Sequence, residues 1–344
     1  MTTETTERAI EYRDAVNEAL HQEMERDTNI ILMGEEMAGG AGRAHLGIID
    51  AWGGAYRTTR GLIQKFGPGR VRDTPLSEGG FIGAAIGAAS SGLRPIAELM
   101  YCDFIGVCMD QILNNAAKMK YMYGGQVNVP LTLMTRVGAG SRAAAQHSES
   151  LYSILVHIPG LKVVLPSDAY TAKGLLISAI RDNDPVIFMD HKSLYRKKCH
   201  VPEELYTYPI GKARTVRKGK DITLVGISAM TWVCTEAADI LAKDGIEAEV
   251  IDVLSVSPLD YDHILESVRK TEHLVIVDED NPRCSVATDI AATVADEAID
   301  YLDAPIKRVT APHTPVPYNP NLEQAYIPNA KRVIDAAKLV LDLK

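Results

Sequence analysis

The sequence predicts an α/β protein of two domains, each with a mainly parallel β-sheet covered by helices. Short apolar runs alternate along the chain with segments of helical periodicity, the pattern of parallel strands joined by crossover helices. The 344 residues suit two domains of roughly 150–200 residues each. A polar stretch containing Pro202 and Pro209 interrupts the alternation. We therefore expect domains at 1–195 and 216–344, joined by a linker at 196–215.

In the N-terminal half, periodic residues at 12–24 predict a helix, and the apolar run at 30–33 predicts a buried strand that ends before Glu35. Residues 38–54 are rich in glycine and predict a long loop, which in a compact domain is usually functional or disordered. A helix of small residues follows Glu78. Further strands are expected at 94–99, 130–134, 161–165 and 185–189, with helices at 105–120 and 172–181.

The C-terminal half repeats the alternation of strands and helices. Strands are expected at 222–227, 248–252, 274–278 and 306–310, and helices at 233–243, 261–270, 285–298 and 330–343. A proline-rich turn separates the last strand from the last helix. Asn329 precedes that helix and is a residue type that caps helix N-termini.

The composition excludes several classes of protein. Hydrophobic residues make up 46% and charged residues 24% of the chain, as in an ordinary globular protein. The net charge of −9 contains no long run of like charges, which argues against a nucleic-acid partner. No apolar stretch reaches the roughly 18 residues of a membrane span, and the N-terminus lacks the pattern of a signal peptide. Five cysteines without a CxxC pair indicate reduced thiols. We expect a cytoplasmic protein that binds neither nucleic acid nor a membrane.

Residue patterns alone leave the chemistry open. The nearest approach to a dinucleotide-binding glycine motif, at 138–143, lacks the acidic residue that should follow about 20 positions later. Glu78 lies between a proline-containing turn and an apolar helix, where desolvation would raise its pKa and suit proton exchange. Spacing alone nevertheless favours a carboxylate that only stabilises the helix dipole. By the same reasoning, Glu35 could be a solvated charge at a strand end, His147 a structural histidine and Phe104 a core residue.

Longer motifs identify a family. In chain order they are GEE at 34–36, DTPLSEGGFIGAAIGAA at 73–89, GLRPIAELM at 92–100, AAQHS at 144–148, HIPGLKVVLPS at 157–167 and AIRDNDPVIF at 179–188. Together they resemble the β subunit of the thiamine-diphosphate-dependent first component of 2-oxo acid dehydrogenase complexes, over nearly the whole chain.

Within this family, some segments are most similar to acetoin dehydrogenases. They are AGGAGRAHLGIIDAWGG at 38–54, AELMYCDFIGVCMDQI at 97–112, DEDNPRCSVATDIA at 278–291 and TAPHTPVPY at 310–318. Residues 57–59 and the loop at 43–49 depart from that pattern, and this loop could help to set substrate choice.

The resemblance implies a transketolase-like, pyrimidine-type thiamine-diphosphate-binding domain followed by a transketolase C-terminal-like domain. It implies catalytic roles for Glu78, His147 and Glu35. Glu78 exchanges a proton with the aminopyrimidine ring of thiamine diphosphate, Glu35 orients this network, and His147 is an acid or base that also contacts the lipoyl group. Cofactor binding involves Glu78 and Glu35 together with Phe104, which packs on the ring, and Leu76.

The resemblance also implies metal ions and partners. A potassium site made mainly of backbone oxygens matches Leu131, Ala179, Ile180, Asp182 and Asp184, although a turn whose aspartates cap backbone groups is the alternative. The GDG motif that holds the pyrophosphate and Mg²⁺ is absent here and belongs to the α subunit in this family. The active site is therefore expected at an interface within an α2β2 heterotetramer, which would dock on a dihydrolipoyl acyltransferase core.

The implied reaction is the cleavage of acetoin to acetaldehyde, with transfer of the acetyl group to a lipoyl acyltransferase. The alternative within the family is the β subunit of a decarboxylating pyruvate or branched-chain 2-oxo acid dehydrogenase. Two further hypotheses stay open, a non-catalytic scaffold for an α subunit and a self-sufficient transketolase-like enzyme.

Overall fold

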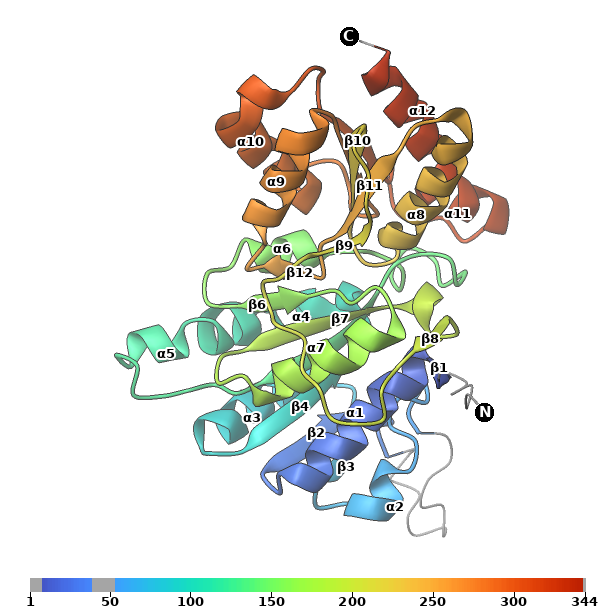
Figure 1. Ribbon diagram of the computed structural model, residues 1–344. Helices are drawn as coiled ribbons and strands as arrows, with labels where there is room; N and C mark the ends of the chain where they lie inside the picture. Colours follow the sequence, from blue (N-terminus) through green and yellow to red (C-terminus); the bar gives the residue numbers. More distant parts are fainter. Residues whose placement is uncertain (1–7, 39–52, 343–344) are drawn as a thin grey trace, which may run out of the picture.

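A computed structural model describes residues 8–38 and 53–342 (Figure 1). The described residues form two large β-sheets, one above the other in Figure 1, and a small two-stranded sheet. Helices cover both faces of each large sheet, and the buried apolar residues form two main clusters. No helix in these ranges is long and apolar enough to span a membrane.

The N-terminal sheet has seven strands in the order β12-β6-β7-β5-β4-β2-β3. They are β2 (Ile30–Gly34), β3 (Val71–Asp73), β4 (Arg94–Leu99), β5 (Thr132–Val137), β6 (Lys162–Val164), β7 (Val186–His191) and β12 (Ser255–Ser257). All neighbouring pairs are parallel except β12 with β6. The carboxyl ends of the parallel strands therefore share one edge of the sheet.

Two long helices pack together on one face of this sheet, α1 (Tyr12–Arg26) and α7 (Ala169–Arg181). The other face carries α3 (Glu78–Ser90), α4 (Ile105–Asp110), a π-helix (Gln111–Ala116), α5 (Met119–Met122) and α6 (Tyr152–Val156). The small residues of α3 permit close packing, because a Cβ on Gly83 would lie 3.1 Å from Oε1 of Gln111. The short elements α2 (Leu62–Phe66), β1 (Ala9–Glu11) and β8 (Lys198–His200) lie at the periphery.

The C-terminal sheet has the order β14-β13-β10-β11-β9. Its strands are β9 (Arg214–Arg217), β10 (Ile222–Gly226), β11 (Ala248–Asp252), β13 (Leu274–Asp278) and β14 (Lys307–Thr310), of which only β9 is antiparallel to its neighbour. Its helices are α8 (Met230–Leu241), α9 (Tyr261–Thr271), α10 (Val286–Ala298), α11 (Pro320–Tyr326) and α12 (Ala330–Leu341). The expected N-cap of α12 is confirmed, since the Asn329 side chain accepts a hydrogen bond from the Arg332 amide.

The structure contains short elements that were not expected, among them α2, β3, α6, β9 and β12, and it differs from the expected elements elsewhere as well. The single helix expected at 105–120 is divided by non-helical backbone at Cys108 and by the π-helix. In the expected linker, β8 pairs with β1. The expected proline-rich turn contains α11, which Asn319 caps and in which Pro320 takes the first position. The loop expected at 38–54 lies largely outside the described residues.

Candidate active site

The residues expected to take part in catalysis and cofactor binding converge on the carboxyl edge of the N-terminal sheet. Glu35 directly follows β2, Phe104 lies just after β4, and the loop that carries His147 follows β5. In open parallel sheets, ligands bind outside the carboxyl ends of the strands. The topology therefore assembles a candidate site from residues that are distant in the sequence.

Glu35 is the most buried of the expected carboxylates. The residue is 6% exposed, and its Oε1 atom has no hydrogen-bond partner within the described part of the chain. Burial raises the pKa of Glu35, and the negative charges of Glu78, Glu36 and Glu98 raise it further. An unsatisfied buried oxygen of this kind is unusual, and a polar ligand would satisfy it.

Glu78 is the first residue of α3 and is only half-buried. The turn before it projects from the surface, and Leu76 in that turn is 82% exposed. Val107 on α4 is also largely exposed, and its carbonyl oxygen lies 3.3 Å from where a Cβ on Gly79 would stand. The desolvation expected for Glu78 is therefore only partial within the described part of the chain, and exposed apolar side chains lie near it.

Phe104 and His147 lie in direct contact. Their ring centroids are 5.3 Å apart in an edge-to-face arrangement, and the Tyr101 ring lies 4.5 Å from His147 and 5.6 Å from Phe104. Lys192 donates a hydrogen bond to the backbone oxygen of His147, and its ammonium group lies 5.2 Å from the Tyr101 ring. Burial lowers the pKa of Lys192. Sequence reasoning did not identify Tyr101 or Lys192.

A buried ion pair lies beside this site. Arg136 on β5 is fully buried, and its Nη2 atom lies 2.6 Å from Oε2 of Glu98 on β4. Its Nε atom donates to the Tyr195 hydroxyl at 2.9 Å, and its guanidinium lies 4.6 Å from the Tyr56 ring. Because the charge of Glu98 also acts on Glu35, this network contributes to the electrostatics of the site.

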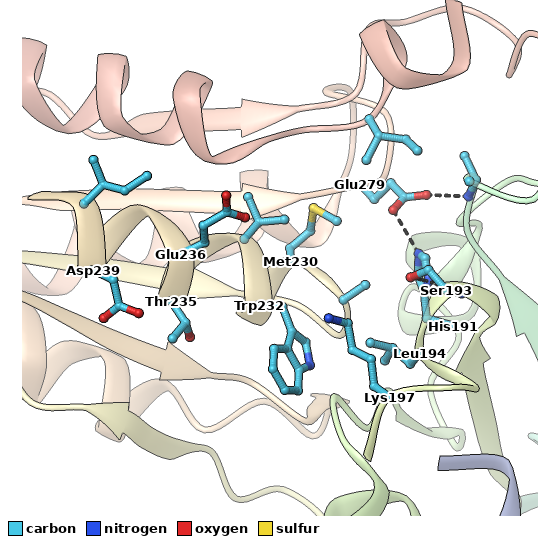
Figure 2. Close-up of a pocket in the computed structure, with 16 residues that line it drawn as sticks. His191, Ser193, Leu194, Lys197, Met230, Trp232, Thr235, Glu236, Asp239 and Glu279 are labelled. Carbon is cyan, nitrogen blue, oxygen red and sulfur yellow. Dashed lines mark hydrogen bonds and ion pairs between the residues drawn. The ribbon is translucent and has the colours of Figure 1, made fainter. Parts of the chain in front are cut away.

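A cavity of about 650 Å³ lies near this edge and is lined by residues from both halves of the chain (Figure 2). His191, at the end of β7, and Glu279, just after β13, meet at one end of it, with 2.9 Å between Nε2 and Oε2. The Lys197 ammonium lies 4.2 Å from the Trp232 ring on another wall. None of the expected site residues lines this cavity, and sequence reasoning did not identify its residues.

The positions expected to bind potassium lie near one another, where α7 leads into β7. Their oxygens already have partners, because Arg94 donates to the backbone oxygens of Ile180 and Asp182, and the Leu131 oxygen accepts from the Val186 amide at 2.9 Å. The Ala179 oxygen accepts from the Asp182 amide at 3.3 Å.

The aspartate carboxylates of this region are also paired. Lys162 lies 2.7 Å from Asp182 and 3.2 Å from Asp184, and Lys120 lies 2.6 Å from Asp184. Among the described residues, no group of three or more His, Cys, Asp or Glu side chains could hold a metal ion. Although the oxygens are of a kind that suits a hard cation, Lys120 and Lys162 already pair with the two carboxylates, and Arg94 donates to two of the backbone oxygens. This arrangement does not fit a further cation.

The sequence matches two family descriptions and is similar to several known proteins. Residues 8–198 match the family described as transketolase, pyrimidine binding domain, and residues 211–333 match transketolase, C-terminal domain. The acetoin:2,6-dichlorophenolindophenol oxidoreductase subunit beta of Bacillus subtilis is 56% identical over 327 residues, which cover 95% of this chain and 96% of that protein. The Cupriavidus necator protein of the same description is 54% identical over 331 residues, 96% of this chain and 97% of that protein.

A further relative and a solved structure complete the comparison. The pyruvate dehydrogenase E1 component subunit beta of Rickettsia felis is 44% identical over 331 residues, 96% of this chain and 98% of that protein. The solved structure, a split-gene transketolase described as an inactive β4 tetramer, has a TM-score of 0.77 and covers 97% of this chain and 99% of its own. Its sequence is 21% identical, so this likeness concerns the fold alone.

Proposed function

Because this chain belongs to the family of dehydrogenase β subunits that combine a transketolase pyrimidine-binding domain with a transketolase C-terminal domain, we propose that it is the β subunit of an acetoin dehydrogenase. The reaction is the cleavage of acetoin to acetaldehyde, with transfer of the acetyl group to a lipoyl acyltransferase. The choice of acetoin rests on identity, since the relatives named for acetoin are 56% and 54% identical and the pyruvate dehydrogenase subunit is 44% identical.

Thiamine diphosphate is the cofactor of this proposal. The observation that carries it is the buried Oε1 of Glu35, which has no partner among the described residues and lies near Glu78, at the sheet edge where Phe104 contacts His147. When bound, the cofactor supplies the carbon nucleophile that attacks the substrate carbonyl. Glu78 would exchange a proton with its aminopyrimidine ring, and Glu35 would hold a proton in this network because its pKa is raised. Phe104 and Leu76 would bind the ring.

His147 is the proposed acid or base on the substrate side. Its ring lies against Tyr101 and Phe104, and Lys192 fixes the backbone oxygen of the same residue. An imidazole held in this way can take up or deliver a proton at a substrate oxygen without first being ordered. It would also meet the incoming lipoyl group.

An α subunit would complete the site. Leu76 and Val107 are exposed apolar residues near the half-buried Glu78, as expected for a surface that a partner covers. The sequence contains no GDG motif, so the diphosphate and Mg²⁺ would be held by the partner. The proposed assembly is an α2β2 heterotetramer on a dihydrolipoyl acyltransferase core. Potassium has no part in the proposal, because three cationic side chains pair with the expected ligands.

We divide these tasks between two domains. The N-terminal domain (1–195) carries Glu35, Glu78, Phe104 and His147, and a linker (196–215) connects it to the C-terminal domain (216–344). In the C-terminal domain, the carboxylates of Glu279 and Glu323 accept hydrogen bonds from backbone amides of the loop before His147.

The test is the substitution Glu78→Gln in the assembled α2β2 enzyme, assayed with an artificial electron acceptor on acetoin and on pyruvate. We expect turnover of acetoin, and a loss of at least about a hundredfold in the variant, the scale of a lost proton-transfer group. Glu297→Gln is the matched control, because Glu297 is an exposed carboxylate on α10.

Each contrary outcome supports a different alternative. Turnover of pyruvate but not of acetoin would overturn the proposal that acetoin is the substrate. Unchanged activity in Glu78→Gln would indicate a non-catalytic scaffold. Turnover by this chain without an α subunit would indicate a self-sufficient transketolase-like enzyme.

A further inference from the structure

The loop that carries His147, residues 138–149 and here called the His147 loop, has an unusual backbone. Gly138 and Gly140 have φ angles of 92° and 97°, which glycine adopts freely. Arg142 and Ala144 also have positive φ angles, 57° and 61°, although each carries a Cβ. Such residues keep this conformation only where surrounding contacts impose it.

A carboxylate of the C-terminal domain supplies contacts of this kind. Oε1 of Glu323, on α11, accepts hydrogen bonds from the amides of Gly140 at 2.8 Å and Arg142 at 3.1 Å. Its Oε2 lies 3.3 Å from the Arg142 amide. Glu323 is 3% exposed and forms no ion pair within residues 8–38 and 53–342. A buried carboxylate with no cation in direct contact depends largely on such N–H donors for its stability, although the positive charge of Lys192 also acts on it.

A second carboxylate continues this row of contacts. Oε1 of Glu279 accepts a hydrogen bond from the Ala139 amide at 2.6 Å, while its Oε2 contacts His191 (Figure 2). Two carboxylates of the C-terminal domain thus accept hydrogen bonds from the backbone amides of residues 139, 140 and 142.

The far end of the loop is held by the N-terminal domain. The Asp103 carboxylate accepts from the amides of Ser148 at 3.2 Å and Glu149 at 3.3 Å. Lys192 donates to the His147 backbone oxygen. The segment that leads into His147 is therefore fixed from the C-terminal domain, and the segment that follows it from the N-terminal domain.

We infer that Glu323 is a positioning residue for the reaction, which holds the His147 loop in its left-handed conformation and thereby keeps the His147 ring against Phe104 and Tyr101. This inference rests on the proposed role of His147. Glu323 itself touches backbone amides and acts only through the loop. Without its carboxylate, Arg142 loses the hydrogen bonds that hold its backbone in the left-handed region, and the imidazole leaves its place.

The first test measures the loop directly, by amide hydrogen exchange of the full chain. We expect peptides spanning 138–149 to exchange about tenfold faster in Glu323→Ala, with strand β10 unchanged. Glu323→Gln retains an acceptor oxygen, so its exchange should stay close to that of the native chain. Gln324→Ala is the control on the same helix, because Gln324 is exposed. Unchanged exchange in Glu323→Ala would overturn the inference.

The second test measures turnover in the assembled enzyme. We expect the kcat of Glu323→Ala to fall at least about tenfold with little change in KM, because a displaced acid or base slows the chemical step more than binding. Glu323→Gln should recover most of the kcat. A Glu323→Gln variant as slow as Glu323→Ala, or a Glu323→Ala variant with native kcat, contradicts the positioning role.

Two further outcomes separate this inference from the proposed function. If Glu323→Ala does not fold, Glu323→Asp replaces it, since its shorter side chain keeps the charge but reaches the amides less well. Native exchange and native kcat in Glu323→Asp would then overturn the inference. If the native enzyme does not turn over acetoin, the proposed function fails, while the exchange experiment still decides whether Glu323 holds the loop.

Discussion

Replacement of Arg136 by methionine should destabilise the protein severely. The side chain is fully buried, and its partner Glu98 is 2% exposed, so Arg136→Met leaves a carboxylate in the core without its ion-pair partner. Although burial lowers the pKa of Arg136, the charges of Glu98 and Asp190 help to raise it well above its ordinary value, so the native residue is charged. Removal of one partner of a buried pair costs about 3–5 kcal/mol.

Two further contacts of Arg136 add to this cost. The guanidinium donates to the Tyr195 hydroxyl at 2.9 Å and to the Thr58 hydroxyl at 3.1 Å, and methionine donates to neither. At roughly 2–4 °C for each kcal/mol, the loss of the ion-pair partner alone corresponds to a fall in melting temperature of about 6–20 °C. Methionine is unbranched and adapts to the space, so a large cavity does not explain such a fall.

The assay is thermal unfolding followed by circular dichroism, with a double-mutant cycle. Arg136→Met and Glu98→Leu are measured singly and together. The double variant should be more stable than Arg136→Met, because an apolar pair often replaces a buried ion pair at little cost. An Arg136→Met variant that melts within about 2 °C of the native protein would refute the reasoning, as would a double variant less stable than both single variants.

Two more predictions follow from the interface between the sheets. Burial and the negative charge of Asp278 raise the pKa of Asp280 to about 7 from an ordinary 3.8, so its stabilising contribution is complete below pH 3.8 and is lost as the pH rises through 7. Thermal melts should therefore show a lower melting temperature at pH 8 than at pH 5. Asp280→Asn should reduce this difference in melting temperature. An Asp280→Asn variant that keeps the native difference would contradict the assignment of this pH dependence to Asp280. Gly138→Ala should lower the free energy of unfolding in urea by at least about 2 kcal/mol, since the φ of Gly138 is 92° and a Cβ would stand 2.0 Å from Nε2 of His191. A variant with the native unfolding midpoint would contradict this prediction.

Local sequence patterns predicted most of the fold. The apolar runs that became β2 and β10, and the periodic residues that became α1, are signals that depend on near neighbours in the chain. The region at 105–120 was predicted less well, because apolar spacing does not distinguish an α-turn from a π-turn. The antiparallel strands β9 and β12 are only 4 and 3 residues long, too short for a periodic signal.

The candidate site was predicted from motifs rather than from physical pattern. Spacing alone favoured a solvated charge at Glu35 and a core residue at Phe104, and only the resemblance supplied their functional roles. Arg136 could have been noticed as the charged residue of β5, which is otherwise made of uncharged residues. Glu323 had no signal, because its partners at 140 and 142 lie more than 180 positions away in the chain. Hydrogen bonds between distant segments are set by the tertiary fold and leave little trace in one sequence.

The strand β12 limits where this chain can be joined to the chain of a relative to make a chimera. It belongs by position to the C-terminal half, yet it covers the outer edge of β6 in the N-terminal sheet. A chain severed in the linker would expose the backbone groups of β6, and an open edge of this kind recruits strands from other molecules. A chimera joined at the linker would place one parent's edge strand on the other parent's sheet. The crossover that keeps this sheet intact therefore lies beyond residue 257, inside the second half of the sequence.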